Sequence, residues 1–150
     1  VAIKLKEDDE LINVTIYNVD YTACVNKNIL SVIIRATLKE GNSSQRVIIQ
    51  TYNYNLSSGQ EVEFVDLLQS KNIQVDSAEA QIQEAIEEQS KYAESLGDTG
   101  NSVYKRDTSD RMYTASRTEN FFLDDEENLY AIYAYGNDNE TTEFDIVEIK

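Results

Sequence analysis

Residues 51–68, TYNYNLSSGQEVEFVDLL, decide how this sequence folds. An alternating aromatic run, typical of a half-buried strand, stops at the turn-forming residues 57–60. The chain restarts as a short extended segment at residues 61–64 and passes into an acidic amphipathic turn at residues 65–68. This order predicts a strand, a tight turn, a short returning strand, and a helical turn that covers an edge or end of a sheet.

The residues before this stretch predict two more strands. Apolar residues occupy alternate positions of the run 30–38, and polar residues lie between them, as in a half-buried antiparallel strand. The preceding run changes phase, and one inserted residue near Ile16, a β-bulge, would restore the alternation. Turns are expected at residues 26–28 and 40–44. In the third strand, Tyr52 and Tyr54 share a face with Ile48 and Leu56, and we expect that face to pack against the main helix.

That main helix is predicted over residues 76–96. Asp76 and Glu79 have the spacing of a capping box, and Gly97 marks the end of the helix. A single apolar stripe at helical spacing indicates a helix that packs on a sheet. The stripe consists of Ala78, Ile82, Ala85, Ile86, Gln89, Ala93 and Leu96.

The last third of the chain returns to strands. Residues 102–105 and 111–114 are candidates for a pair of strands, residues 120–123 and 129–135 for a hairpin, and residues 143–149 for a closing strand. The predicted fold class is α+β. We expect a single domain over residues 1–150, with one antiparallel sheet of about five to six strands in β-β-β-α-β-β-β order and the helix on one face.

Charge and composition limit the possible partners. The chain has 13 basic and 28 acidic residues, a net charge of −15, which disfavours nucleic acid and anionic lipid surfaces. No apolar run approaches the roughly 18–20 residues of a membrane span, so direct membrane insertion is not expected. The chain begins at Val1, and we interpret it as one module of a longer exported protein from which the signal sequence is absent.

The residue patterns of the common catalytic sites are missing from the sequence. There is no histidine, and the single cysteine, Cys24, lies in an apolar run where a thiol acts as a small core residue. No nucleophile elbow, phosphate loop or dinucleotide fingerprint is present, so we predict no catalytic residues, no cofactor and no metal site. Two acidic runs, 124–127 and 137–140, lack the register of a calcium loop. The basic residues between 105 and 117 leave two interpretations open: they offset the acidity of the domain, or they bind an anion.

Three motifs together resemble a known domain. They are the runs NILSV (28–32), YNYNLSSG (52–59) and VDLL (65–68), followed by a helix, an aromatic pair and a hairpin. The chain resembles a domain of unknown function found in bacterial envelope proteins. These proteins include RsiV-type anti-sigma factors, PdaC-type peptidoglycan deacetylases and surface proteins with copper-amine-oxidase-like wall modules. In the deacetylases the catalytic residues lie in a separate domain, so the resemblance implies no catalytic role for this chain.

The resemblance implies a location outside the cell or at its surface. The expected function is a non-catalytic extracytoplasmic module that binds a protein or a cell-wall polymer. Two alternatives stay open: a carbohydrate-active or peptidoglycan-modifying enzyme that works through carboxylates, and a purely structural spacer. Because acidic residues are so abundant, no particular pair of carboxylates is singled out by the sequence.

An exposed aromatic patch would be the best candidate binding surface. The candidates for ligand binding are Tyr130, Tyr133 and Tyr135, because residues 129–135 are apolar or aromatic on both faces. Such a strand either lies between two covering layers or leaves one aromatic face open.

Overall fold

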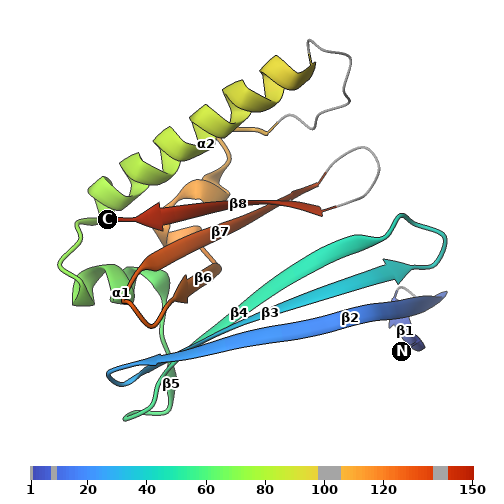
Figure 1. The fold of residues 1–150 in the computed structure, drawn as a ribbon, viewed down its shortest axis with the longest axis horizontal. Coiled ribbons are helices and arrows are strands. Elements are labelled where there is room, and N and C mark those ends of the chain that lie inside the picture. Colours follow the sequence, from blue (N-terminus) through green and yellow to red (C-terminus); the bar gives the residue numbers. More distant parts are fainter. Residues whose placement is uncertain (1, 8–9, 98–105, 137–141) are drawn as a thin grey trace.

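The computed structural model, which describes residues 2–7, 10–97, 106–136 and 142–150, is an α+β fold with antiparallel sheets, as predicted (Figure 1). In chain order, the strands and helices are β1 (Ala2–Glu7), β2 (Glu10–Asn26), β3 (Ile29–Glu40), β4 (Arg46–Asn55), β5 (Gln60–Glu61), α1 (Phe64–Ser70), α2 (Val75–Gly97), the 3₁₀ turns η1 (Arg111–Tyr113) and η2 (Ala115–Arg117), β6 (Asn120–Leu123), β7 (Leu129–Gly136) and β8 (Thr142–Ile149).

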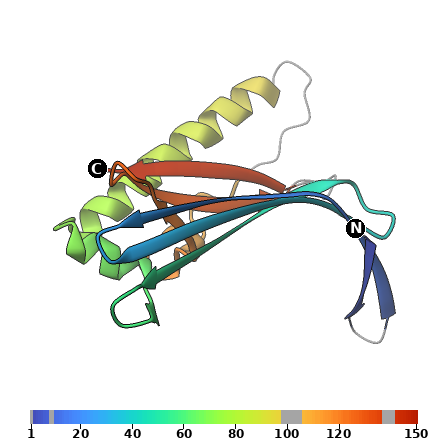
Figure 2. The same ribbon diagram turned by 60° about the horizontal axis from the view of Figure 1, so that its bottom comes forward.

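The strands form two sheets, so the prediction of a single sheet is wrong. A five-stranded sheet, which we call the long sheet, has the order β1-β2-β3-β4-β5, and a three-stranded short sheet has the order β6-β7-β8. The predicted strand order also lacked β1. The short returning strand and the helical turn predicted at residues 61–68 are present as β5 and α1, although β5 covers only Gln60–Glu61. Both helices and the short sheet lie on one side of the long sheet, whose three longest strands extend beyond them (Figures 1 and 2).

Polar side chains of the long sheet explain why β6 does not extend it. Leu123 N–H donates a hydrogen bond to Ser31 Oγ, and Phe121 N–H donates to Thr51 Oγ1, each with a donor–acceptor distance of 3.0 Å. Asn53 Nδ2 donates to the Phe121 carbonyl oxygen over 2.9 Å. The three polar side chains are buried. They satisfy the backbone groups along the outer edge of β6, so β6 lies across the face of the long sheet rather than beside its last strand.

We call these contacts between β6 and the polar side chains of β3 and β4 the seam. They show that β4 has the opposite orientation to the predicted one. Thr51 and Asn53 take the inward positions, and side chains alternate along a strand, so Tyr52 and Tyr54 point to the opposite face. Their exposed fractions are 41% and 37%. The prediction that these tyrosines pack against the main helix is therefore wrong.

The hydrophobic core lies between the short sheet and the helices. Among the residues whose side chains are described, its members come from residues 62–149, and the long sheet adds the partly buried Ile29 to this cluster. The Phe64 and Phe121 rings, with centroids 5.4 Å apart, join α1 to β6. At the end of β8, Lys150 N–H donates to Gln81 Oε1 over 2.8 Å, which fixes this strand to α2. The core consists of Val62, Phe64, Leu67, Leu68, Ala78, Ile82, Ile86, Tyr113, Ala115, Phe121, Leu123, Leu129, Ala131, Tyr133, Val147 and Ile149.

Several local predictions are confirmed and others are wrong. The strand register shifts between Ile16 and Asn18, which is the predicted bulge, and α2 matches the predicted helix within one residue at each end. The expected strand at 111–114 is instead a 3₁₀ turn, and residues 102–105 lie outside the described residues. The capping box occurs at Glu63 and Asp66 of α1, whereas Asp76 lies inside the first turn of α2.

Candidate binding face

The outward side of the long sheet has an uncharged face, built from β2, β3 and β4. The strand register places twelve side chains on it in four rows, because directly paired residues of antiparallel strands point to the same side. The rows are Val19, Ala36 and Ile48; Tyr21, Ile34 and Gln50; Ala23, Val32 and Tyr52; Val25, Leu30 and Tyr54. None is charged, although 27% of the chain is, which would give about three charged residues in twelve.

The outer strands of this face are open to solvent. Tyr21 is 73% exposed, and Val19 and Val25 are 56% and 57% exposed. The β3 residues between them are partly buried, because neighbours flank them on both sides. With strands about 4.8 Å apart and same-face residues about 6.8 Å apart, the face measures roughly 14 Å by 27 Å, or about 400 Å². That is typical of the largest apolar patch on a monomer, which is often functional.

The chemistry of the face is that of contact rather than reaction. Tyr21, Tyr52 and Tyr54 present rings with an apolar surface and a hydroxyl that accepts and donates hydrogen bonds. The remaining polar member of the twelve is the Gln50 amide. The pairing of β4 with β5 places the Glu61 carboxylate beside Tyr54, where it marks the edge of the face. Such a surface binds flat ligands by stacking and apolar contact.

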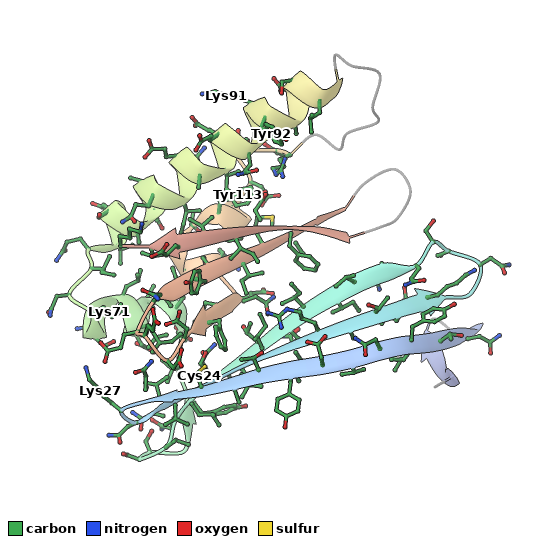
Figure 3. The ribbon with its side chains drawn as sticks, in the orientation of Figure 1. Cys24, Lys27, Lys71, Lys91, Tyr92 and Tyr113 are labelled. Carbon is green, nitrogen blue, oxygen red and sulfur yellow. The ribbon has the colours of Figure 1, made fainter. Side chains whose placement is uncertain are left out.

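The tyrosines selected from the sequence lie elsewhere. Tyr133 is 3% exposed, its hydroxyl is 2.7 Å from Thr118 Oγ1, and its ring meets that of Tyr113 with centroids 5.0 Å apart. Burial raises the pKa of Tyr133 to about 12. Tyr133 is therefore a core residue and offers no contact surface. Tyr113 lies under α2 (Figure 3).

Tyr130 and Tyr135 give no evidence of an exposed aromatic patch either. Tyr130 is partly buried, and its hydroxyl is 3.4 Å from Asp124 Oδ2. Desolvation raises the pKa of the Tyr130 hydroxyl, and the negative charges of Asp124 and Glu148 raise it further. The Tyr135 side chain lies outside the described residues. The exposed tyrosines that the structure does describe on the long sheet were missed because β4 was given the opposite orientation.

One sequence signal could have revealed that orientation. The inward positions Ser31, Thr51 and Asn53 are short and polar, and such side chains readily bond to backbone groups. Ser31 pairs with Asn53, and Thr51 lies on the same side of β4 two residues before Asn53. Three such side chains together suit the capping of another strand's edge better than solvent contact. Cys24, expected in the core, is partly buried on this inward side opposite Ser31.

A cleft lies where four turns meet, at the end of the molecule that carries Lys27 and Lys71 (Figure 3). It has a volume of about 550 Å³. Lys27 Nζ forms an ion pair with Glu127 Oε1 at 3.2 Å, and Lys71 Nζ donates to the Glu127 carbonyl oxygen over 2.7 Å. Both amines therefore hold the turns together. Ser58 and Ser70 line the cleft, but with no histidine in the chain they lack the usual base of a nucleophilic site.

The acidic turns do not assemble a metal site in the described part of the chain, where no three potential ligands converge. Asp124 accepts hydrogen bonds from the N–H groups of Glu126 and Asn128 at 2.9 and 2.8 Å. Desolvation opposes ionisation of this carboxyl, but these bonds, with those from the Asn128 side chain and Tyr130, outweigh it and lower the pKa of Asp124. Its oxygens therefore stabilise the β6–β7 turn. The acidic run 137–140 lies outside the described residues.

The basic residues between 105 and 117 lie in different environments in the structure. Arg106 forms a buried ion pair with Asp145, whereas Arg111 and Arg117 are exposed and line a shallow cleft of about 480 Å³ beside β7. Lys105 lies outside the described residues.

Comparisons with known proteins leave the chain without an assigned family. No protein-family model matches it, and no curated protein matches it. Within the described residues, no helix is both long and apolar enough to cross a membrane.

Proposed function

We propose that this chain is a non-catalytic module of a bacterial cell-surface protein, and that it binds an uncharged glycan of the cell wall through the uncharged face. The resemblance of the runs 28–32, 52–59 and 65–68 to the bacterial envelope domain supports the location. The observation that carries the binding proposal is the exposure of Tyr21, Tyr52 and Tyr54 on one face of twelve uncharged side chains.

The chemistry of tyrosine favours a glycan as the ligand. A sugar ring has an apolar face of C–H groups and an equatorial rim of hydroxyls, which matches an aromatic ring with a polar edge. Tyr52 and Tyr54 are two residues apart on one strand, about 6.8 Å, and can contact neighbouring parts of one extended chain. Gln50 continues the same line of β4 with an amide that both donates and accepts hydrogen bonds.

Charge and area argue against the other ligand classes. A net charge of −15 repels the phosphate or carboxylate groups of an anionic polymer. A stable protein–protein interface buries about 800 Å² on each partner, roughly twice the area of the uncharged face. A neutral glycan needs neither a charged site nor so large an area.

The carboxylate-enzyme alternative gains no support from the described carboxyl groups. A glycosidase acid needs a raised pKa. The two described carboxyls with shifted pKa values, Asp107 and Asp124, are shifted downward. In Asp107 the cause is a pair of hydrogen bonds from Ser109, and in Asp124 it is the bonding within its own turn.

Co-sedimentation with bacterial cell walls stripped of their anionic polymers tests the proposal. The intact chain should sediment with the walls, and a Tyr52→Ala/Tyr54→Ala variant should lose at least about fivefold in affinity, since each stacking contact is worth about 0.5–1.5 kcal/mol. Tyr92→Ala is the matched control, because Tyr92 is 62% exposed but lies on α2 (Figure 3).

Salt provides a second measurement. Binding by uncharged groups should change little between low and high salt, because ionic screening acts on charges. Retention of full affinity by the double variant, or a steep loss of binding with salt, would contradict the proposal. Capture of a soluble protein by this face without binding to stripped walls would replace the glycan with a protein partner.

A further inference from the structure

β2 has an open edge along half of its length. Its first part, from Glu10 to Thr15, pairs with β1, whereas the part from Asn18 to Asn26 pairs with β3 on one side. Among the described residues, no strand lies along the other side of that second part. The open edge is bounded by β1 at Thr15 and by the β2–β3 turn after Asn26.

The turn determines which backbone groups point outward. Asn26 pairs with Ile29 around a two-residue turn, so these two residues form the first hydrogen-bonded pair of the hairpin. Because such pairs alternate, even-numbered residues of β2 bond to β3. The N–H and C=O groups of Val19, Tyr21, Ala23 and Val25 therefore point away from β3, into solvent.

Few of the devices that usually prevent strand addition occur along this edge. Natural edges carry lysine, proline or bulges along their length. Between Asn18 and Asn26 the one charged residue is Asp20, and its carboxylate is 3.4 Å from Arg35 of β3. The bulge lies at Tyr17, just before the open part begins. Residues 18–23 are all exposed.

We propose that the open edge of β2 pairs with the same edge of a second copy of the chain, antiparallel, about a two-fold axis at Thr22. This register uses the whole interval from Asn18 to Asn26 and stops short of β1. It places Val19 opposite the other copy's Val25, and Tyr21 opposite its Ala23, so outward-pointing backbone groups meet each other.

Side-chain pairing in this register is favourable as well. Asp20 lies opposite Cys24 of the other copy, so the acidic side chains do not face each other, and like charges directly opposite would destabilise the pair. The axis passes between two Thr22 residues, a pairing that stabilises antiparallel strands. An isologous edge contact of this kind closes at two copies and leaves no free β2 edge.

Pairing would also join the two uncharged faces into one continuous surface of about 800 Å², since each contributes about 400 Å² on the same side of the sheet. The edge pairing rests on the open strand and not on the proposed glycan ligand. A dimer that binds no glycan would leave this inference intact, and glycan binding by a monomer would overturn only the dimer.

Cross-linking tests the register. Asp20→Cys should form an intermolecular disulfide with Cys24, because residues of a non-hydrogen-bonded pair have Cα atoms about 4.5 Å apart, within the disulfide range of about 4.4–6.8 Å. Val25→Cys is the matched control, since position 25 faces Val19 of the other copy. Most of the Asp20→Cys chains should run as covalent dimers after mild oxidation, with little dimer for Val25→Cys.

Sedimentation of the unmodified chain at high micromolar concentration should show a dimer. Ala23→Pro removes an outward N–H without breaking the β2–β3 ladder, and Thr22→Lys places two like charges at the axis. Both variants should sediment as monomers with an unchanged circular dichroism spectrum. A monomeric unmodified chain, or equal cross-linking of Asp20→Cys and Val25→Cys, would overturn the proposal.

Discussion

The buried ion pair between Arg106 and Asp145 gives the sharpest stability prediction. Arg106 Nε and Nη2 contact the two carboxylate oxygens at 2.5 and 2.8 Å, and both side chains are 4% exposed. Arg106 also lies 3.5 Å from the carbonyl oxygen of Gln89, so it connects β8 to α2. Removing either partner leaves an uncompensated buried charge.

Asp145→Ala and Arg106→Ala should each lower the free energy of unfolding by about 3–5 kcal/mol, a large share of the roughly 5–15 kcal/mol of a typical domain. The double substitution Arg106→Met/Asp145→Leu should cost far less than the sum, because apolar residues of similar volume often replace a buried pair without loss. The free energies of unfolding are measured by urea denaturation followed by circular dichroism. If a single-substitution variant is partly unfolded, the measurement is made at low temperature.

An exposed pair serves as the control. Lys150 and Glu148 are 3.6 Å apart, with side chains 76% and 41% exposed, and Glu148→Gln should cost less than about 1 kcal/mol. The reasoning fails if each single Arg106 or Asp145 variant loses less than about 1 kcal/mol, or if the double variant loses as much as the two singles added together.

Two further predictions concern Tyr133 and the seam between the sheets. The folded-state pKa of Tyr133 is raised from 10.0 to about 12, so the stability from its buried hydroxyl is complete below pH 10 and is lost as the pH rises through 12. The free energy of unfolding should fall by about 2–3 kcal/mol over this range. The fall should be missing in Tyr133→Phe but present in the control Tyr92→Phe. Identical dependence of the unfolding free energy on alkaline pH in the two variants would contradict this. Asn53→Ala should cost about 1–3 kcal/mol by leaving the Phe121 carbonyl oxygen unpaired, and should speed hydrogen exchange in β6 relative to β7, whereas the exposed Asn18→Ala should do neither.

The sequence predicts those parts of the fold that depend on neighbours in the chain. The bulge near Ile16, the turn after β4 and the helix over 76–96 are local patterns, and the structure contains each of them. Apolar and polar residues do alternate in β3, but its apolar side, with Leu30 and Val32, points outward, whereas Ser31 and Ile33 are buried. The side of β4 that lies inward depends instead on Asn53 meeting Phe121, 68 residues later. No local pattern reports that contact, so the tyrosines of β4 were assigned to the wrong face.

The same limit applies to the candidate site. Both faces of β7 are apolar or aromatic, so alternation cannot say whether Tyr133 or Tyr130 is buried. The answer comes from Thr118 and Tyr113, which pack against Tyr133 from outside the strand. The expectation of an exposed aromatic surface remains useful, but its residues are those of β2 and β4.

The placement of the core determines when this chain can fold during its synthesis. The strands β1 to β4 leave the ribosome before the rest of the described chain, yet among the described side chains the long sheet adds one partly buried residue, Ile29, to the main core. Val147 and Ile149 of β8 are also members of that core. The core between the short sheet and the helices therefore cannot close until β8 has been made.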